Sequence, residues 1–128
     1  MDYESGTVIF QKEADVALEP ASMTKLMTLA VVFNEIRAGR VSLDDEFFVS
    51  ENAWRTGGAA SGGSTMFAEL NSQIRVEDLV RSVIIQSGND AAIVLAEGIA
   101  GSEATFALMM NELAGDLGLE GSNFTNST

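Results

Sequence analysis

Two side chains near the start of the chain, Ser22 and Lys25, have the types and the spacing that acyl transfer requires. They lie three residues apart in the segment Pro20-Ala21-Ser22-Met23-Thr24-Lys25, so on a helix they share one face and the hydroxyl can meet the amine. Proline favours the start of a helix, where the backbone dipole supplies partial positive charge to a developing negative oxygen. The spacing predicts Ser22 as a nucleophile and Lys25 as its proton acceptor.

For this chemistry the amine of Lys25 must be neutral near pH 7. The apolar neighbours Met23, Leu26 and Met27 favour that state, because desolvation lowers the pKa of a lysine. A neutral amine needs hydrogen-bond partners, and the hydroxyls of Ser22 and of a second serine, Ser87, are suitable. The competing interpretation is that Ser22 only caps a helix and Lys25 is only a solvated charge, since Ser-X-X-Lys is common by chance.

Composition excludes several other kinds of site. The 128 residues contain no histidine and no cysteine, so Ser-His-Asp catalysis, Cys-His catalysis, disulfides and the usual zinc ligands are ruled out within this chain. We expect neither a metal nor an organic cofactor. The net charge of -12 would repel phosphate backbones, so nucleic acid is not an expected partner.

The hydropathy pattern predicts a mostly helical chain with a few short strands, which is an α+β fold. Gly57, Gly58, Gly62 and Gly63 fall within a small-residue loop that lasts until Thr65. The longest apolar runs are too short for a membrane-spanning helix, and no signal peptide is visible. The predicted strands are Thr7 to Gln11, Glu46 to Ser50 and the beginning of one within Ser122 to Thr128, and the predicted helices are Pro20 to about Ala38, Val76 to Gln86, Asp90 to Ile99 and about Ser102 to Leu117.

The tripeptide Ser87-Gly88-Asn89 stands between two apolar helical segments, 65 residues after Ser22. A Ser-X-X-Lys followed by a later Ser-X-Asn is the signature of penicillin-binding proteins and serine β-lactamases. Because it contains both motifs in this order, the chain resembles the D-alanyl-D-alanine carboxypeptidases, which are the low-molecular-mass penicillin-binding proteins. Four segments carry the likeness in order: Met1-Asp2-Tyr3 with Ser5-Gly6, Pro20 to Thr28, Gly63-Ser64-Thr65-Met66-Phe67, and Ser87-Gly88-Asn89-Asp90-Ala91.

The resemblance implies a role for each residue of the two motifs. Ser22 would be acylated by the D-Ala-D-Ala carbonyl, Lys25 would accept its proton, Ser87 would relay a proton to the leaving amine, and Asn89 would hold the substrate amide. The implied reaction removes the terminal D-alanine of peptidoglycan pentapeptides without a cofactor. The implied partners are the peptidoglycan stem peptide and β-lactam antibiotics, and the implied location is periplasmic or extracytoplasmic.

The third element of the family, a Lys-Thr-Gly strand, is absent, since the only other lysine is Lys12 and Glu13 follows it. We therefore expect residues 1–128 to be an N-terminal fragment of a single DD-peptidase catalytic domain. It would be the mostly helical portion of the fold, with most of the antiparallel sheet missing and little or no turnover of its own. An unpaired strand at Thr7 to Gln11 would leave an exposed edge, which predicts self-association.

Two other functions stay open at the level of the sequence. A serine β-lactamase of the same superfamily would share Ser22, Lys25 and Ser87, and would add a means of activating water for rapid deacylation. A noncatalytic helical module could instead use its acidic surface to bind a basic partner. Labelling by a penicillin separates these interpretations.

Overall fold

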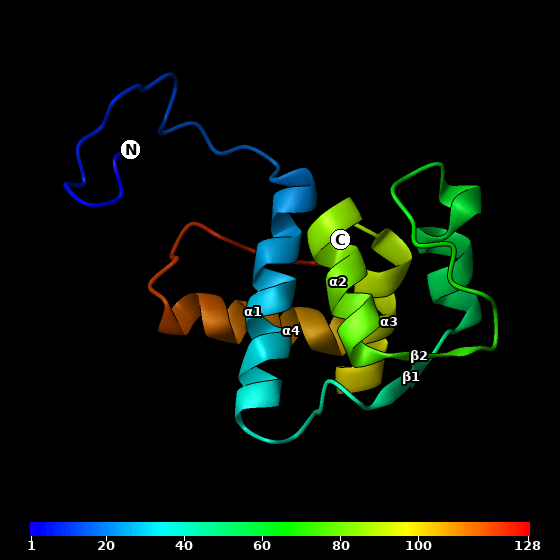
Figure 1. Ribbon diagram of the computed structural model, residues 1–128. Helices are drawn as coiled ribbons and strands as arrows, with labels where there is room; N and C mark the ends of the chain where they lie inside the picture. The colour runs from blue at the N-terminus through cyan, green and yellow to red at the C-terminus, as the bar shows by residue number, and fades with distance from the viewer.

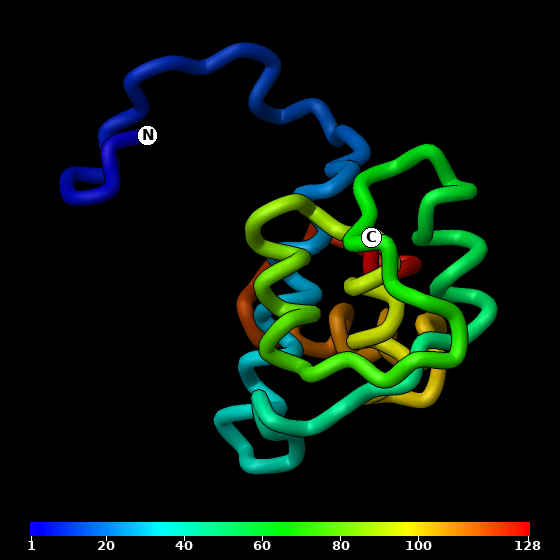
Figure 2. Tube along the Cα trace, turned by 45° about the vertical axis from the view of Figure 1, so that its right-hand side comes forward, coloured from blue at the N-terminus to red at the C-terminus, as the bar shows by residue number.

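The computed structural model describes all 128 residues, and its body is built from four helices beside a two-stranded sheet (Figure 1). Residues 1–19 are almost wholly exposed and run away from this body in both views (Figure 1, Figure 2). The elements in chain order are the short turn η1 (Ala21–Met23), α1 (Thr24–Arg37), β1 (Glu46–Phe48), the helical turns η2 (Ala53–Gly57) and η3 (Ala59–Ser61), β2 (Gln73–Arg75), α2 (Val76–Gln86), α3 (Asn89–Ala100) and α4 (Glu103–Asp116).

Helix α3 is the centre of the core. Its residues Ala91 to Ala96 are all buried, because this stretch is apolar on every side and no face of it favours water. It packs against η2, α2, α4 and α1. The loop that includes η2 is therefore fixed to the core helix.

The other helices each bury one side. Helix α2 buries Val76, Leu79, Val80 and Val83, which recur at helical spacing as the sequence predicts. Helix α4 begins at a Ser102 cap, whose Oγ accepts a hydrogen bond from the Thr105 backbone N–H at 3.1 Å.

The sheet consists of β1 and β2 in antiparallel pairing, with Phe47 opposite Ile74. Phe47 lies against α3, where a side chain at Gly98 would meet its ring at 2.2 Å. Glycine at this position lets the sheet approach the core helix closely.

The α+β prediction, with a mostly helical body and little sheet, is confirmed. No single helix is both long and apolar enough to span a membrane, and only α3 and α4 taken together reach that length and composition, with a bend of 85° between them.

Two strand predictions are wrong. Residues Thr7 to Gln11 form no strand, and neither do Ser122 to Thr128. A strand is stabilised by hydrogen bonds to a neighbour, and no other segment of the chain pairs with either stretch. Val8, Ile9 and Phe10 are exposed, and self-association through them stays a prediction.

Candidate active site

The start of α1 brings Ser22 and Lys25 together. The Nζ of Lys25 donates a hydrogen bond to the Oγ of Ser22 at 3.2 Å, because the turn η1 leads directly into α1 and keeps the two residues on one face. Ser22 is exposed, whereas Lys25 is only 3% exposed. The hydroxyl is open to a substrate, while the amine is held behind it.

Burial lowers the pKa of Lys25 below its ordinary value of 10.5. The amine has one further partner, since it donates to the backbone oxygen of Thr128 at 3.1 Å. The preceding residue, Ser127, accepts a hydrogen bond through its backbone oxygen from the buried Thr28 Oγ1 at 2.8 Å. Residues 127 and 128 therefore lie along α1, and Thr128 contacts the lysine amine.

The backbone before Ser22 is strained. Ala21 has a φ of 49°, in the left-handed region that costs a non-glycine residue roughly 1–2 kcal/mol. Such residues persist only where the surrounding structure holds them, and they are common at active sites. The strain therefore lies directly before Ser22.

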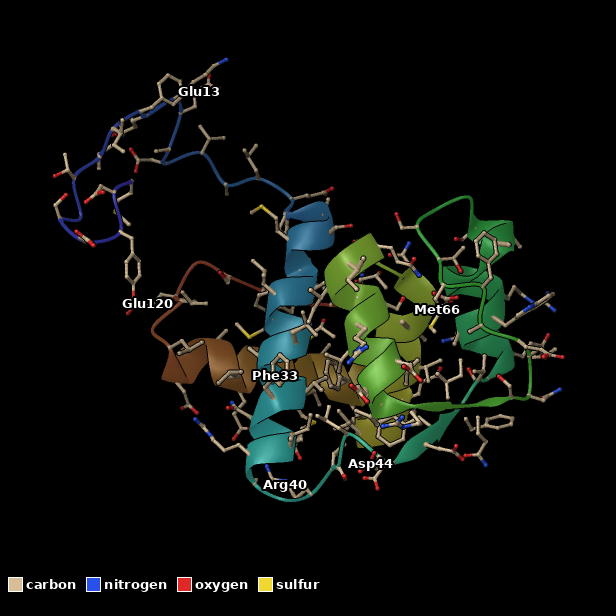
Figure 3. All side chains as sticks on the ribbon, in the orientation of Figure 1. Glu13, Phe33, Arg40, Asp44, Met66 and Glu120 are labelled. Carbon is tan, nitrogen blue, oxygen red and sulfur yellow. The ribbon has the colours of Figure 1, made fainter.

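Ser87 and Asn89 lie in the turn between α2 and α3. Ser87 ends α2 with a φ of 58°, and Gly88 precedes the first residue of α3, Asn89. In Figures 1 and 2 alike, the start of α1 and this turn lie side by side at one end of the body. Arg40, labelled in Figure 3, lies at the other end of α1.

No hydrogen bond joins Ser87 or Asn89 to Ser22 or Lys25, so the structure brings the two motifs to one end without linking them directly. Both residues are half-buried, and their side-chain polar atoms have no protein partner. Two surface hollows lie beside the start of α1, and both are lined by Pro20 and Thr24.

Sequence reasoning missed Asp90, the residue after the tripeptide. Its carboxylate is fully buried and accepts hydrogen bonds from the segment that contains Thr65, Met66 and Ala68. An acidic residue at the start of an otherwise apolar helix was the available signal, since carboxylates are stabilised there.

Comparison with known proteins identifies the family of the chain. The family model of peptidase S11, D-alanyl-D-alanine carboxypeptidase, matches residues 1–128. The chain belongs to this family. The resemblance inferred from the sequence motifs is thus confirmed.

Relatives and solved structures agree with the family assignment. The chain is 46% identical over 125 residues to the D-alanyl-D-alanine carboxypeptidase DacC of Escherichia coli, covering 97% of this chain and 31% of the relative. It is 36% identical to DacF of Bacillus subtilis, covering 100% and 32%. It superposes on penicillin binding protein 5 of Haemophilus influenzae with a TM-score of 0.90 and 40% identity, covering 99% of this chain and 36% of that one.

The chain therefore spans about a third of the length of the relatives it matches. The solved structures also confirm the predicted fold class, since this half-helical chain with a two-stranded sheet matches part of a DD-peptidase fold.

Proposed function

We propose that residues 1–128 form the N-terminal part of the single catalytic domain of a serine-type D-Ala-D-Ala carboxypeptidase. The observation that carries the proposal is the 3.2 Å hydrogen bond between the buried Lys25 amine and the exposed Ser22 hydroxyl. Family membership supports it, because the matched relatives bear the name D-alanyl-D-alanine carboxypeptidase. The substrate would be the pentapeptide stem of peptidoglycan, which places the protein outside the cytoplasm.

Ser22 is the nucleophile in this proposal. Its Oγ bonds to the carbonyl carbon of the penultimate D-alanine, and its proton passes to the neutral amine of Lys25. The lowered pKa of Lys25 supports this role, because a lysine of ordinary pKa would hold its proton at neutral pH. The N-terminal end of α1 stabilises the negative charge that develops nearby.

The acyl-enzyme forms when the bond between the carbonyl carbon and the terminal D-alanine nitrogen breaks. We assign Ser87 to the relay of a proton to that nitrogen and Asn89 to the binding of the substrate amide. Water then attacks the ester, which restores the Ser22 hydroxyl and releases the shortened peptide. The half-buried, unpartnered side chains of Ser87 and Asn89 support the two assignments.

A β-lactam would acylate the same Ser22 oxygen, because its strained amide presents a carbonyl to the same nucleophile. The family's Lys-Thr-Gly strand does not occur in these residues. We therefore expect little or no turnover from residues 1–128 alone, and the test uses the full-length protein.

The test is labelling by a fluorescent penicillin, followed by intact mass measurement. We expect a stable penicilloyl adduct on the wild type and on the control Ser42→Ala, whose exposed serine follows the opposite end of α1. No adduct should form on Ser22→Ala.

Other outcomes separate the alternatives. Rapid loss of the adduct with consumption of the β-lactam would indicate a serine β-lactamase. Labelling that is absent from the wild type, or unaffected in Ser22→Ala, would reject the nucleophile and favour a noncatalytic module.

A further inference from the structure

Asp90 is a buried charged group that the proposed reaction does not use. It is the second residue of α3 and follows Asn89 directly, and its exposure is 0%. None of the ion pairs in the structure includes it. Burial of an unpaired carboxylate is costly unless hydrogen-bond donors surround it.

Four donors satisfy the Asp90 carboxylate. Oδ1 accepts from the backbone N–H groups of Met66 and Ala91, both at 2.9 Å. Oδ2 accepts from the Thr65 hydroxyl at 2.6 Å and from the Ala68 backbone N–H at 3.0 Å. Only the Ala91 bond lies within α3, and the other three tie a distant segment to the helix.

We call that segment, residues 63–68, the strap. Met66, labelled in Figure 3, marks its position beside α3. The strap also contacts Asn89 directly, because the Ser64 backbone oxygen accepts a hydrogen bond from the Asn89 backbone N–H at 2.8 Å. A Cβ built on Gly63 would lie 2.6 Å from the Asn89 side-chain nitrogen, so the backbone of Gly63 lies against the amide.

We infer that Asp90 is a positioning residue: its carboxylate holds the strap against the turn between α2 and α3, and the strap fixes the side-chain amide of Asn89 for the substrate. The inference rests on the proposed function, in which Asn89 binds the substrate amide. Fixing one amide rotamer before binding reduces the entropy lost when the substrate binds. Asp90 itself touches no substrate.

The variant Asp90→Asn tests this with little change in size. Each carboxylate oxygen accepts two bonds, so whichever position becomes an NH₂ loses two of the four and places a donor against donors. The strap should loosen. The expected result in the full-length protein is a KM for a D-Ala-D-Ala peptide raised about tenfold, with kcat little changed.

The matched control is Glu97→Gln on the same helix. Glu97 accepts from Ser50 Oγ at 2.6 Å and from Asn52 Nδ2 at 2.9 Å, so it also ties a loop to α3, but near the opposite end. We expect its KM to stay at the wild-type value. The pH profile of acylation should be the same in all three proteins, because none of these changes touches Lys25.

A second variant covers the case in which Asp90→Asn does not fold. Gly63→Ala leaves the carboxylate intact and pushes directly on the Asn89 amide, so it should raise KM as well. A wild-type KM in Gly63→Ala and in any folded Asp90→Asn would overturn the inference, as would a loss of acylatable protein without a change in KM. If penicillin does not label Ser22 in the wild type, the proposed function fails and the inference fails with it. If the wild type is labelled normally and the KM of the variants is unchanged, only the positioning role of Asp90 is rejected.

Discussion

Gly57 ends the turn η2 and lies against the start of α3, where there is no room for a side chain. A Cβ at this position would lie 2.5 Å from the Asp90 backbone nitrogen, 2.6 Å from its Cα and 2.8 Å from the carbonyl carbon of Asn89. Ordinary contacts between such atoms are about 3.5 Å, so Gly57→Ala forces the two backbones apart by about 1 Å. All three neighbours are main-chain atoms of a buried helix, which cannot turn aside as a side chain does.

Overpacking of this kind costs about 1–3 kcal/mol of unfolding free energy. With an unfolding entropy of about 2.1 cal/mol/K per residue, the midpoint for a chain of this length should fall by about 4–11 °C. Thermal unfolding followed by circular dichroism measures the shift. The same displacement moves the segment that carries Asn89, so acylation of the full-length protein should also slow.

The control is Gly115→Ala in α4, where nothing lies within 4 Å of the added Cβ. Alanine is favoured over glycine inside a helix by up to about 1 kcal/mol, so this variant should unfold at the wild-type temperature or above it. The two substitutions are chemically identical and differ only in their surroundings. A Gly57→Ala protein that is as stable as Gly115→Ala would refute the close packing of η2 on α3.

Two further variants test the burial of Lys25 and the role of Asn111 in holding the last residues of the chain. Burial lowers the pKa of Lys25, so between the lowered pKa and 10.5 the unfolded state binds more protons than the folded state. The free energy of unfolding of the wild type should therefore rise with pH over that range. Lys25→Met should lack this gain, and at pH 7 it should be as stable as the wild type or about 1 kcal/mol more stable; equal pH slopes in urea unfolding would contradict this. Asn111→Ala removes the amide that donates to the Phe124 oxygen at 2.7 Å and accepts from its N–H at 2.8 Å, so stability should fall by about 2 kcal/mol. Amide exchange in residues 124–128 should rise in that variant, and unchanged exchange would show that Asn111 does not hold this stretch.

Local periodicity was sufficient to predict the helices. The predicted bounds of α2, Val76 to Gln86, are those of the structure, because its apolar stripe and its first-turn acids both act within a few residues. The strands could not be predicted in the same way. Gln73-Ile74-Arg75 has one apolar residue and forms β2 only because β1 pairs with it, whereas Thr7 to Gln11 has the composition of a strand and no partner.

The candidate site likewise combines contacts between residues close in sequence with contacts between residues far apart in sequence. The contact between Ser22 and Lys25 spans three residues and follows from helix geometry, so the sequence predicts it. The contacts of Asp90 with the strap span more than 20 residues, and that of Lys25 with Thr128 spans 103. Pairings of that length depend on how the elements pack, which no local pattern specifies.

The turn that carries Ser87 shows how packing overrides local preference at this site. Ser87 adopts a left-handed φ although glycine follows it immediately, which is the reverse of the usual preference at a helix end. Close packing explains why glycine occupies position 88 and serine position 87. A Cβ on Gly88 would lie 2.3 Å from the Ser82 Oγ, so position 88 requires glycine, and the left-handed φ falls on Ser87. Hydrogen bonds from the Ser87 N–H to the Val83 oxygen at 3.2 Å and from the Gly88 N–H to the Ser82 oxygen at 3.3 Å hold this conformation. The strained backbone at this helix end fixes the direction of the Ser87 Cα–Cβ bond, because residues with such a φ persist only where the surrounding structure holds them.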